Sequence, residues 1–215
     1  SKALNFGVYT ADLAYITSLG QMDDASKFFE TIRNLSKDLE IENAVDEVIL
    51  KRLQSNLENS NADSLFYLSN ETYYNAYSYL EENDRRDVLA MIVVGGWIEG
   101  LNIILNLESY SDGSEVCQRI ADQKLTLENL MIFTSTIEND QLSDIVGELS
   151  AIEEVFNSEI IEEEAEAEAT EFTSSESEDG VMIFGGGVSS SISEAQFNEL
   201  KSIVLDLRTS IIEGI

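Results

Sequence analysis

Histidine and proline are both absent from this chain, and cysteine occurs once. Without histidine, the commonest general base and the commonest metal ligand of proteins are missing, so we predict no metal site, no cofactor and no catalytic residue. The alternative is a hydrolase that works through Asp and Glu side chains alone. Because proline interrupts helices, its absence favours long ones. Cys117 cannot form an internal disulfide, and with no histidine to activate it we expect a buried structural thiol.

Basic residues are scarce: 12 Lys and Arg stand against 42 Asp and Glu, which gives a formal charge of -30. A polyanion repels phosphate groups, so nucleic acids and anionic membrane surfaces are poor partners. No run reaches about 18 uninterrupted apolar residues, and we therefore predict no transmembrane segment. The chain opens at Ser1 with neither an initiator Met nor an apolar signal region. We expect any signal peptide or lipid anchor to precede residue 1.

Hydrophobic residues make up 43% of the 215 positions, and they are spaced with the period of helices. Apolar side chains recur three and four residues apart, and the chain is long enough for one substantial core. We predict an all-α, single-domain bundle of about eight helices, with ends marked by capping residues such as Asn43, Asn61 and Gly20. The predicted helices cover about 4–19, 25–39, 45–57, 61–82, 84–107, 114–137, 139–160 and 193–215.

The boundary between the fourth and fifth of these helices is ambiguous. A break near Asn83-Asp84 puts two glutamates at a helix C-terminus and two arginines at a helix N-terminus, both unfavourable for the helix dipole. One continuous helix would instead pair Glu81 with Arg85 and Glu82 with Arg86, four residues apart. We place a break here, and we expect the very apolar helix that follows to be the central one.

The composition changes sharply after residue 161. Residues 162–180 are rich in Glu, Ala, Ser and Thr, and they cannot bury enough apolar surface to offset the entropy of ordering them. We predict a mobile acidic segment there, after a helical bundle of residues 1–161. Two β-like runs, Val181–Phe184 and Val188–Ile192, flank three glycines and predict a small hairpin in 181–192. Ser193 and Gln196 form a capping box that opens a C-terminal helix, 193–215, packing back on the bundle.

Three glycines interrupt the apolar helix around the only tryptophan, Trp97. Each interior glycine costs about 1 kcal/mol relative to alanine, so Gly95, Gly96 and Gly100 need a compensating reason. One reason is close packing of another helix, in which case leucine at Gly96 or Gly100 would overpack the contact. The other is a groove beside Trp97 with Glu99 at its edge.

Tyrosines cluster before this helix, where five of the eight fall within thirteen residues: Tyr67, Tyr73, Tyr74, Tyr77 and Tyr79. A tyrosine combines an apolar ring with a hydroxyl that needs a partner, which suits either the margin of a core or the wall of a ligand site. Core packing is the plainer interpretation. The candidate ligand-binding residues are Tyr73, Tyr77, Trp97 and Glu99.

Part of the N-terminal region resembles a tetratricopeptide helix pair, in Leu13-Ala14-Tyr15, Asp24-Ala25 and Phe28-Phe29. No second copy follows about 34 residues later, and a single copy cannot bury its own hydrophobic face. We therefore expect an ordinary helical hairpin.

A broader resemblance covers most of the first 135 residues and, loosely, the last helix. The segments Gly7–Tyr15, Tyr79–Arg85, Val94–Leu101 and Ala121–Leu125 are similar to those of a family of bacterial cell-envelope lipoproteins from gut-type Gram-negative anaerobes. These motifs mark a family and no reaction. The resemblance implies an exported, tethered, all-helical domain.

We therefore expect a non-catalytic cell-envelope protein, periplasmic or anchored to the outer membrane, that binds a protein partner or a ligand. The alternative is a small-molecule or glycan-binding module that uses the Tyr and Trp surface. A deep pocket lined by Trp97 and tyrosines would favour a ligand, and a flat apolar patch would favour a protein. Two carboxylates about 5–10 Å apart in a cleft would favour the hydrolase.

Overall fold

The protein is described by a computed structural model that covers residues 1–41, 55, 74, 76–158, 173–176, 182–185 and 191–214. The prediction of an all-α protein is confirmed. Residues 76–82 are helical, and six further helices are α1 (Lys2–Ser18), α2 (Met22–Asp38), α5 (Arg86–Leu107), α6 (Glu115–Ser135), α7 (Asp140–Asn157) and α8 (Glu194–Glu213). Almost all of the predicted helix 45–57, and the start of the next, lie outside the described residues, so the count of eight helices stays a prediction.

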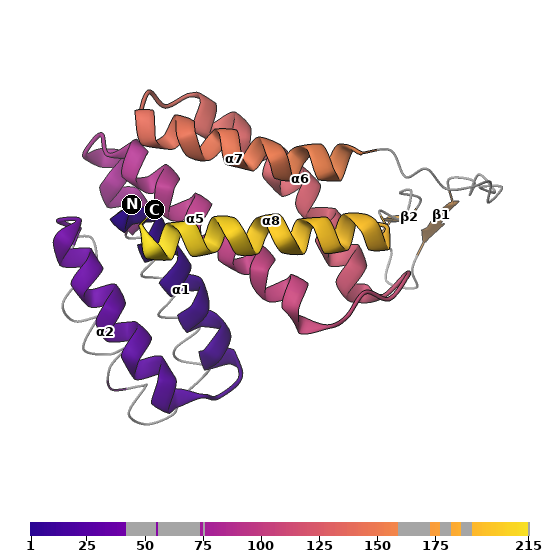
Figure 1. The fold of residues 1–215 in the computed structure, drawn as a ribbon, viewed down its shortest axis with the longest axis horizontal. Helices are drawn as coiled ribbons and strands as arrows, with labels where there is room; N and C mark the ends of the chain where they lie inside the picture. The colour runs from indigo at the N-terminus through magenta and orange to yellow at the C-terminus, as the bar shows by residue number, and fades with distance from the viewer. Residues whose placement is uncertain are drawn as a thin grey trace.

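The helices pack around α5, which contacts α1, α6, α7 and α8. In Figure 1, α8 lies between α7 and α1, with α5 and α6 behind it. The expected helical hairpin at the N-terminus is present, since α1 packs on α2 and the rings of Tyr9 and Phe28 lie 5.9 Å apart. The central position predicted for the apolar helix is confirmed.

Side-chain caps begin three of the helices where the sequence indicates. The Ser114 hydroxyl accepts a hydrogen bond from the Cys117 amide at the start of α6, and the Asn139 side chain accepts one from the Leu142 amide at the start of α7. Ser193 and Gln196 form the predicted capping box of α8. The buried Gln196 amide group also donates to the Val155 carbonyl at 3.0 Å, which ties the end of α7 to the start of α8.

Four of the described helices end with a residue in the left-handed conformation, and Gly214 after α8 is one of them. The other three share a second feature. Gly20, with φ of 71°, follows α1. Glu40 and Asp84, both with φ of 56°, occupy the same place after α2 and after the helical residues 76–82. In each case the next amide bonds back across the last turn, as in Arg85 N to Leu80 O at 2.8 Å. This geometry satisfies carbonyls that a helix end leaves open.

The break predicted near Asn83-Asp84 is confirmed, and Arg85 explains why it is tolerated. Its guanidinium does not pair with Glu81 across a continuous helix. It reaches the C-terminal end of α2 and donates to the Leu39 carbonyl at 2.8 Å. An arginine that is unfavourable at the start of its own helix is thus favourable at the end of another, where open carbonyls carry partial negative charge.

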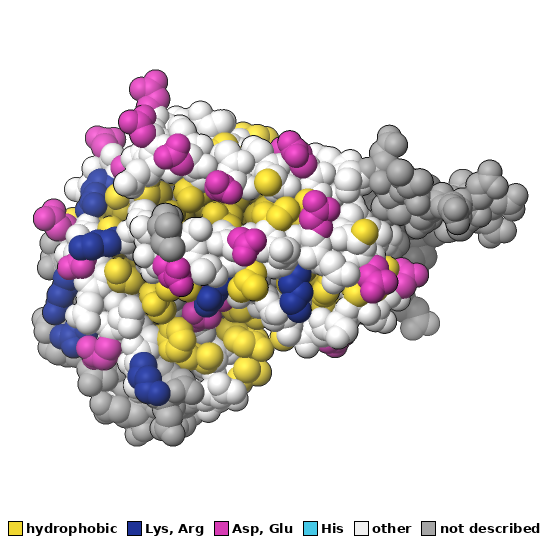
Figure 2. Space-filling model, in the orientation of Figure 1, with side chains coloured by type: hydrophobic (Ala, Val, Ile, Leu, Met, Phe, Trp, Pro, Cys, Tyr) yellow, Lys and Arg dark blue, Asp and Glu magenta, His cyan; other side chains and the backbone are white. Residues whose placement is uncertain are grey.

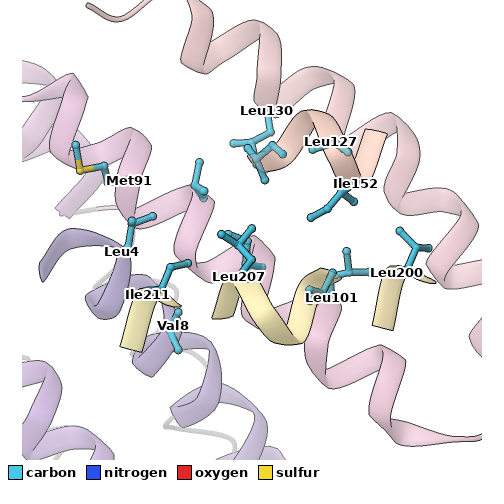
Figure 3. Close-up of a cluster of buried hydrophobic side chains, with 14 of the residues drawn as sticks. Leu4, Val8, Met91, Leu101, Leu127, Leu130, Ile152, Leu200, Leu207 and Ile211 are labelled. Atoms are coloured by element: carbon cyan, nitrogen blue, oxygen red, sulfur yellow. The ribbon is translucent and has the colours of Figure 1, made fainter. Parts of the chain in front are cut away.

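One hydrophobic core joins the helices. Figure 3 shows side chains from α1, α5, α6, α7 and α8 pointing into the same interior, with Leu4, Leu101, Leu127, Ile152 and Leu207 among them. The apolar stripe predicted for α8 is buried along its whole length, from Phe197 to Ile211. Burying such side chains is the main favourable term in folding.

Among the described residues, α5 alone is long and apolar enough to cross a membrane, and 56% of its most apolar stretch is buried inside the bundle. It also carries the ionisable side chain of Glu99, which is 1% exposed. The central helix of a bundle has the same length and composition, so the helix gives no clear transmembrane segment.

Two short strands occur late in the chain, β1 (Thr173–Glu176) and β2 (Met182–Gly185), and they pair antiparallel. The strand β2 overlaps the predicted run Val181–Phe184. Its partner, however, lies before it, inside the segment predicted to be mobile and acidic. Pairing with Val188–Ile192 is not confirmed, because residues 186–190 lie outside the described residues, as does the rest of the acidic segment 162–180.

Candidate functional site

Three of the four residues chosen from the sequence can be placed. Tyr73 lies outside the described residues, and Tyr77 is 37% exposed in the helical residues 76–82. Trp97 lies in the middle of α5. At a rise of about 1.5 Å per residue, it is about 16 Å along the helix axis from Arg86, the first residue of α5. Glu99 lies on the same helix but contacts other elements. The ligand wall of Tyr73, Tyr77, Trp97 and Glu99 therefore stays a prediction.

Trp97 is half-buried and packs against the core. Its indole Nε1 donates a hydrogen bond to Oε1 of Gln123 on α6, with the two atoms 3.2 Å apart. A buried indole N–H needs such a partner, and here the partner is supplied by the protein itself. Trp97 therefore joins α5 to α6 and has its polar group already occupied.

Two glycines lie where another helix packs closely. Gly95 fits the first of the two explanations given for the glycines of this helix, and Gly7 of α1 was not singled out from the sequence. A Cβ atom on Gly95 would lie 2.1 Å from the Leu4 carbonyl oxygen, and one on Gly7 would lie 2.1 Å from the Ile92 carbonyl oxygen. A Cβ on Gly96 would make an ordinary contact at 3.6 Å, and one on Gly100 would meet nothing within 4 Å. A Cβ alone therefore does not overpack at Gly96 or Gly100, and the overpacking expected for leucine there stays a prediction.

Glu99 lies inside the bundle in a charged cluster drawn from three helices. Its carboxylate pairs with the Arg208 guanidinium of α8 and accepts a hydrogen bond from the Asn102 amide at 3.0 Å. Asp12 of α1 is the third member, with its carboxylate oxygen 3.6 Å from the same guanidinium. The Asp12 side chain is 15% exposed and that of Glu99 is 1% exposed. This Asp12–Glu99–Arg208 cluster fastens α8 to α1 and α5.

The cluster has one guanidinium for two carboxyl groups. This excess of acidic groups affects the pKa of Asp12. The pKa of Asp12 is raised from 3.8 to about 7. Burial is the largest cause, repulsion from Glu99 and a hydrogen bond with it act in the same direction, and the Arg208 guanidinium opposes them. Two nearby carboxyl groups favour sharing a proton. The Asp12 carboxyl is therefore half-protonated near neutral pH.

Two converging carboxyl groups are what a hydrolase would need, but these two are held in structural contacts. Glu99 is buried and bonded on both oxygens, to Arg208 and to Asn102. Neither Asp12 nor Glu99 lines either of the two hollows described below. Within the described residues, no group of three His, Cys, Asp or Glu side chains could hold a metal ion. The charged groups of the cluster contact one another inside the bundle.

A hollow of about 550 Å³ lies between α7 and α8, and we call it the α7/α8 hollow. It is open to solvent, and Figure 2 shows a band of apolar side chains between these helices with acidic side chains on both sides. The lining residues are Ser1, Leu4, Asp144, Ile145, Glu148, Ala151, Ile203, Asp206, Leu207, Ser210, Ile211 and Gly214.

A second hollow, of about 500 Å³, lies where α6 meets the end of α7 and the residues before α8. Leu125, which is 65% exposed, lines it together with Phe156 and Ile192. Its charged residues are of both signs, because Lys124 lies beside Asp122 and Glu128.

Cys117, expected to be a buried structural thiol, is buried and free.

Sequence reasoning missed Asp12, Arg208 and the α7/α8 hollow. Arg208 lies 109 residues from Glu99, so only the fold brings them together. A signal was nonetheless available, since Glu99 is a single charged residue between Asp87 and Glu108 of a very apolar helix. A buried charge of this kind requires a partner of opposite sign.

No family model, curated protein or solved structure matches this chain in comparisons of its sequence and fold.

Proposed function

We propose that this chain is a non-catalytic protein of the cell envelope that binds a protein partner in the α7/α8 hollow. The observation that carries the proposal is the apolar floor of this hollow, where the half-buried Ile145 and Ile203 line a solvent-open space together with the buried Ile211. Apolar surface in an open groove between two helices is typical of a site that receives a segment of another protein. The assignment to the envelope is supported by the resemblance of Gly7–Tyr15 and Val94–Leu101 to envelope lipoproteins.

The Tyr and Trp surface is the weaker candidate for binding. Trp97 has its N–H bonded to Gln123, and Glu99 is bonded to Arg208 and Asn102. A ligand would have to displace these contacts before it could use either side chain, which costs binding energy. The α7/α8 hollow needs no such displacement, because the half-buried Ile145 and Ile203 that line it have no polar contact to break.

Site-specific photo-cross-linking in intact producing cells tests the proposal. A photoreactive amino acid replaces Ala151 in the hollow, Tyr77 on the tyrosine surface, or Glu154, which is exposed on α7 outside the hollow. We expect one discrete protein adduct from position 151, in the envelope fraction, and none from the other two positions. Adducts from position 77 alone, or equally from all three positions, would overturn the proposal.

A further inference from the structure

The rim of the α7/α8 hollow is charged, and the charged side chains among its described residues are all acidic. Asp144 and Glu148 lie one turn apart on α7, and Asp206 lies on α8. No Lys or Arg lines the hollow in the part of the chain that the structure describes, whereas the second hollow includes Lys124. An apolar floor between two acidic walls has the charge pattern opposite to that of a basic amphipathic helix.

The cations of α7 and α8 have other contacts than this rim. α7 contains no Lys or Arg, and α8 contains two. Arg208 pairs with Glu99 and Asp12 in the cluster with α1 and α5, and the Lys201 amine lies over the Phe197 ring, 6.0 Å from its centroid. Three carboxylates around apolar surface repel one another, and an incoming cation would relieve that repulsion.

The length of the hollow fits about three turns of helix. Its lining on α8 runs from Ile203 to Gly214, which spans about 16 Å at a rise of about 1.5 Å per residue. A helix that presents apolar side chains at positions i, i+4, i+7 and i+11 would cover that length with one face. Lys or Arg on either side of this face would then lie over Asp144, Glu148 and Asp206.

We propose that the α7/α8 hollow binds a basic amphipathic helix of a partner protein, apolar face inward and Lys or Arg side chains against the acidic rim. This inference rests on the proposed function and names the chemistry of the partner. A nucleic acid or an anionic membrane does not fit the same rim, because both carry negative phosphate groups.

Binding of synthetic peptides to the whole chain tests the inference. The probe is a fluorescent peptide of about 15 residues with leucines on one helical face, lysines beside them and alanines elsewhere. One control has the same composition with the leucines shuffled off the common face, and a second replaces every lysine by glutamate. We expect the basic amphipathic peptide to bind at least tenfold more tightly than either control, with an affinity that falls as salt is added.

Variants of the protein locate the site. Glu148→Lys reverses a rim charge, and Glu154→Lys makes the same change of charge on α7 outside the hollow. We expect at least fivefold weaker binding for Glu148→Lys and less than twofold change for Glu154→Lys. Ala151→Phe fills the hollow and should reduce binding at least tenfold, with circular dichroism checking that the helices are retained.

Each result bears on one of the two proposals. Equal binding of the shuffled peptide would mean general attraction to a polyanion and would overturn the inference, as would unchanged binding by Ala151→Phe. If no peptide binds while position 151 still cross-links an envelope protein, the partner is not a basic helix and the proposed function stands. If the basic peptide binds but no adduct forms in cells, the hollow has the inferred chemistry and the proposed function fails.

Discussion

The contact between α1 and α5 and the contact between α7 and α8 are opposite solutions to packing two helices. At α1 and α5 the backbones touch, because Gly7 and Gly95 leave no side chain between them. At α7 and α8 larger residues, such as Ile145 and Ile203, line a space that the two helices do not fill. The contact between α1 and α5 leaves no room for a side chain between the two backbones. The contact between α7 and α8 leaves partly buried apolar side chains in contact with water.

The comparison shows which side of the bundle holds the closest contacts. Close packing and the Asp12–Glu99–Arg208 cluster both lie on the side of the bundle formed by α1, α5 and α8. One side of α8 is thus held by charge, and its C-terminal half leaves the α7/α8 hollow open toward α7. An open groove beside a rigid wall is preorganised for binding, because little ordering remains to be done when the partner arrives.

Arg208→Met should have the largest effect on stability, because it leaves Glu99 buried without its cation. The Arg208 side chain is 25% exposed, so we expect a loss of about 3 kcal/mol at pH 8, at the lower end for buried pairs. The loss should shrink at pH 5, where Asp12 is protonated. Urea denaturation at both pH values measures it. The control is Lys201→Met, which removes the other cation of α8 and should cost less than about 1 kcal/mol. Equal losses of stability in the two variants would contradict a special role for the cluster.

Gly95→Ala should come next, since its Cβ would collide with the Leu4 carbonyl. We expect a loss of about 1–3 kcal/mol from overpacking of backbone that cannot move aside easily. Gly100→Ala is the matched control on the same helix, where the added methyl meets open space. It should instead stabilise the protein by about 0.5–1 kcal/mol through helix propensity. Thermal unfolding of the two variants checks both signs, and two losses of similar size would refute the close contact.

Asp12→Asn should alter how stability depends on pH. The pKa of Asp12 is raised above its unfolded value to about 7, so the folded protein binds this proton more tightly. Its contribution therefore improves stability as pH falls from 7 toward 4 and is lost as pH rises through 7. At pH 8 the neutral amide should raise the Tm by about 2–4 °C, the effect of about 1 kcal/mol in a chain of this size. Only below about pH 4, where Asp12 is protonated in the unfolded chain as well, should the two proteins nearly coincide.

The control for this pH effect is Glu154→Gln, which neutralises an exposed carboxylate on α7. Its Tm should follow that of the unmodified protein at every pH, within the small range of surface changes. An Asp12→Asn protein with an unchanged pH slope would show that the Asp12 carboxyl does not titrate near neutrality.

Ala151→Phe should have the smallest effect on stability of the free protein. If the α7/α8 hollow is open space, a larger apolar side chain fits there, and the free energy of unfolding should change by less than about 0.5 kcal/mol. Urea denaturation measures the change. A loss of 1 kcal/mol or more would mean that α7 and α8 already pack closely, and the contrast with α1 and α5 would disappear.

The helical part of the fold could be predicted from the sequence because its signals are local. The caps Ser114, Asn139 and Ser193 precede their helices directly, and Gly20 marks the end of the first helix. The break after Asn83 was also predicted, but its cause was not. Arg85 bonds to Leu39 O across 46 residues of sequence, and helix dipoles of other elements are invisible before the chain is folded.

The candidate sites were less predictable for the same reason. The three glycines of α5 look alike in sequence, yet Gly95 alone among them meets a neighbouring backbone closely. Glu99 was chosen as a residue at the edge of a groove, and its actual contacts come from α1 and α8. The α7/α8 hollow arises from the distance between two helices, which periodicity cannot supply.

The left-handed residues at two helix ends open a practical route for studying the binding surface. Glu40 and Asp84 adopt a backbone conformation that glycine reaches freely and that costs other residues about 1–2 kcal/mol. Both lie outside the core, the charged cluster and the α7/α8 hollow. Glycine at these two positions would give a more stable parent protein. Variants with disruptive substitutions elsewhere could then be purified and compared, at the cost of two of the chain's 42 acidic residues.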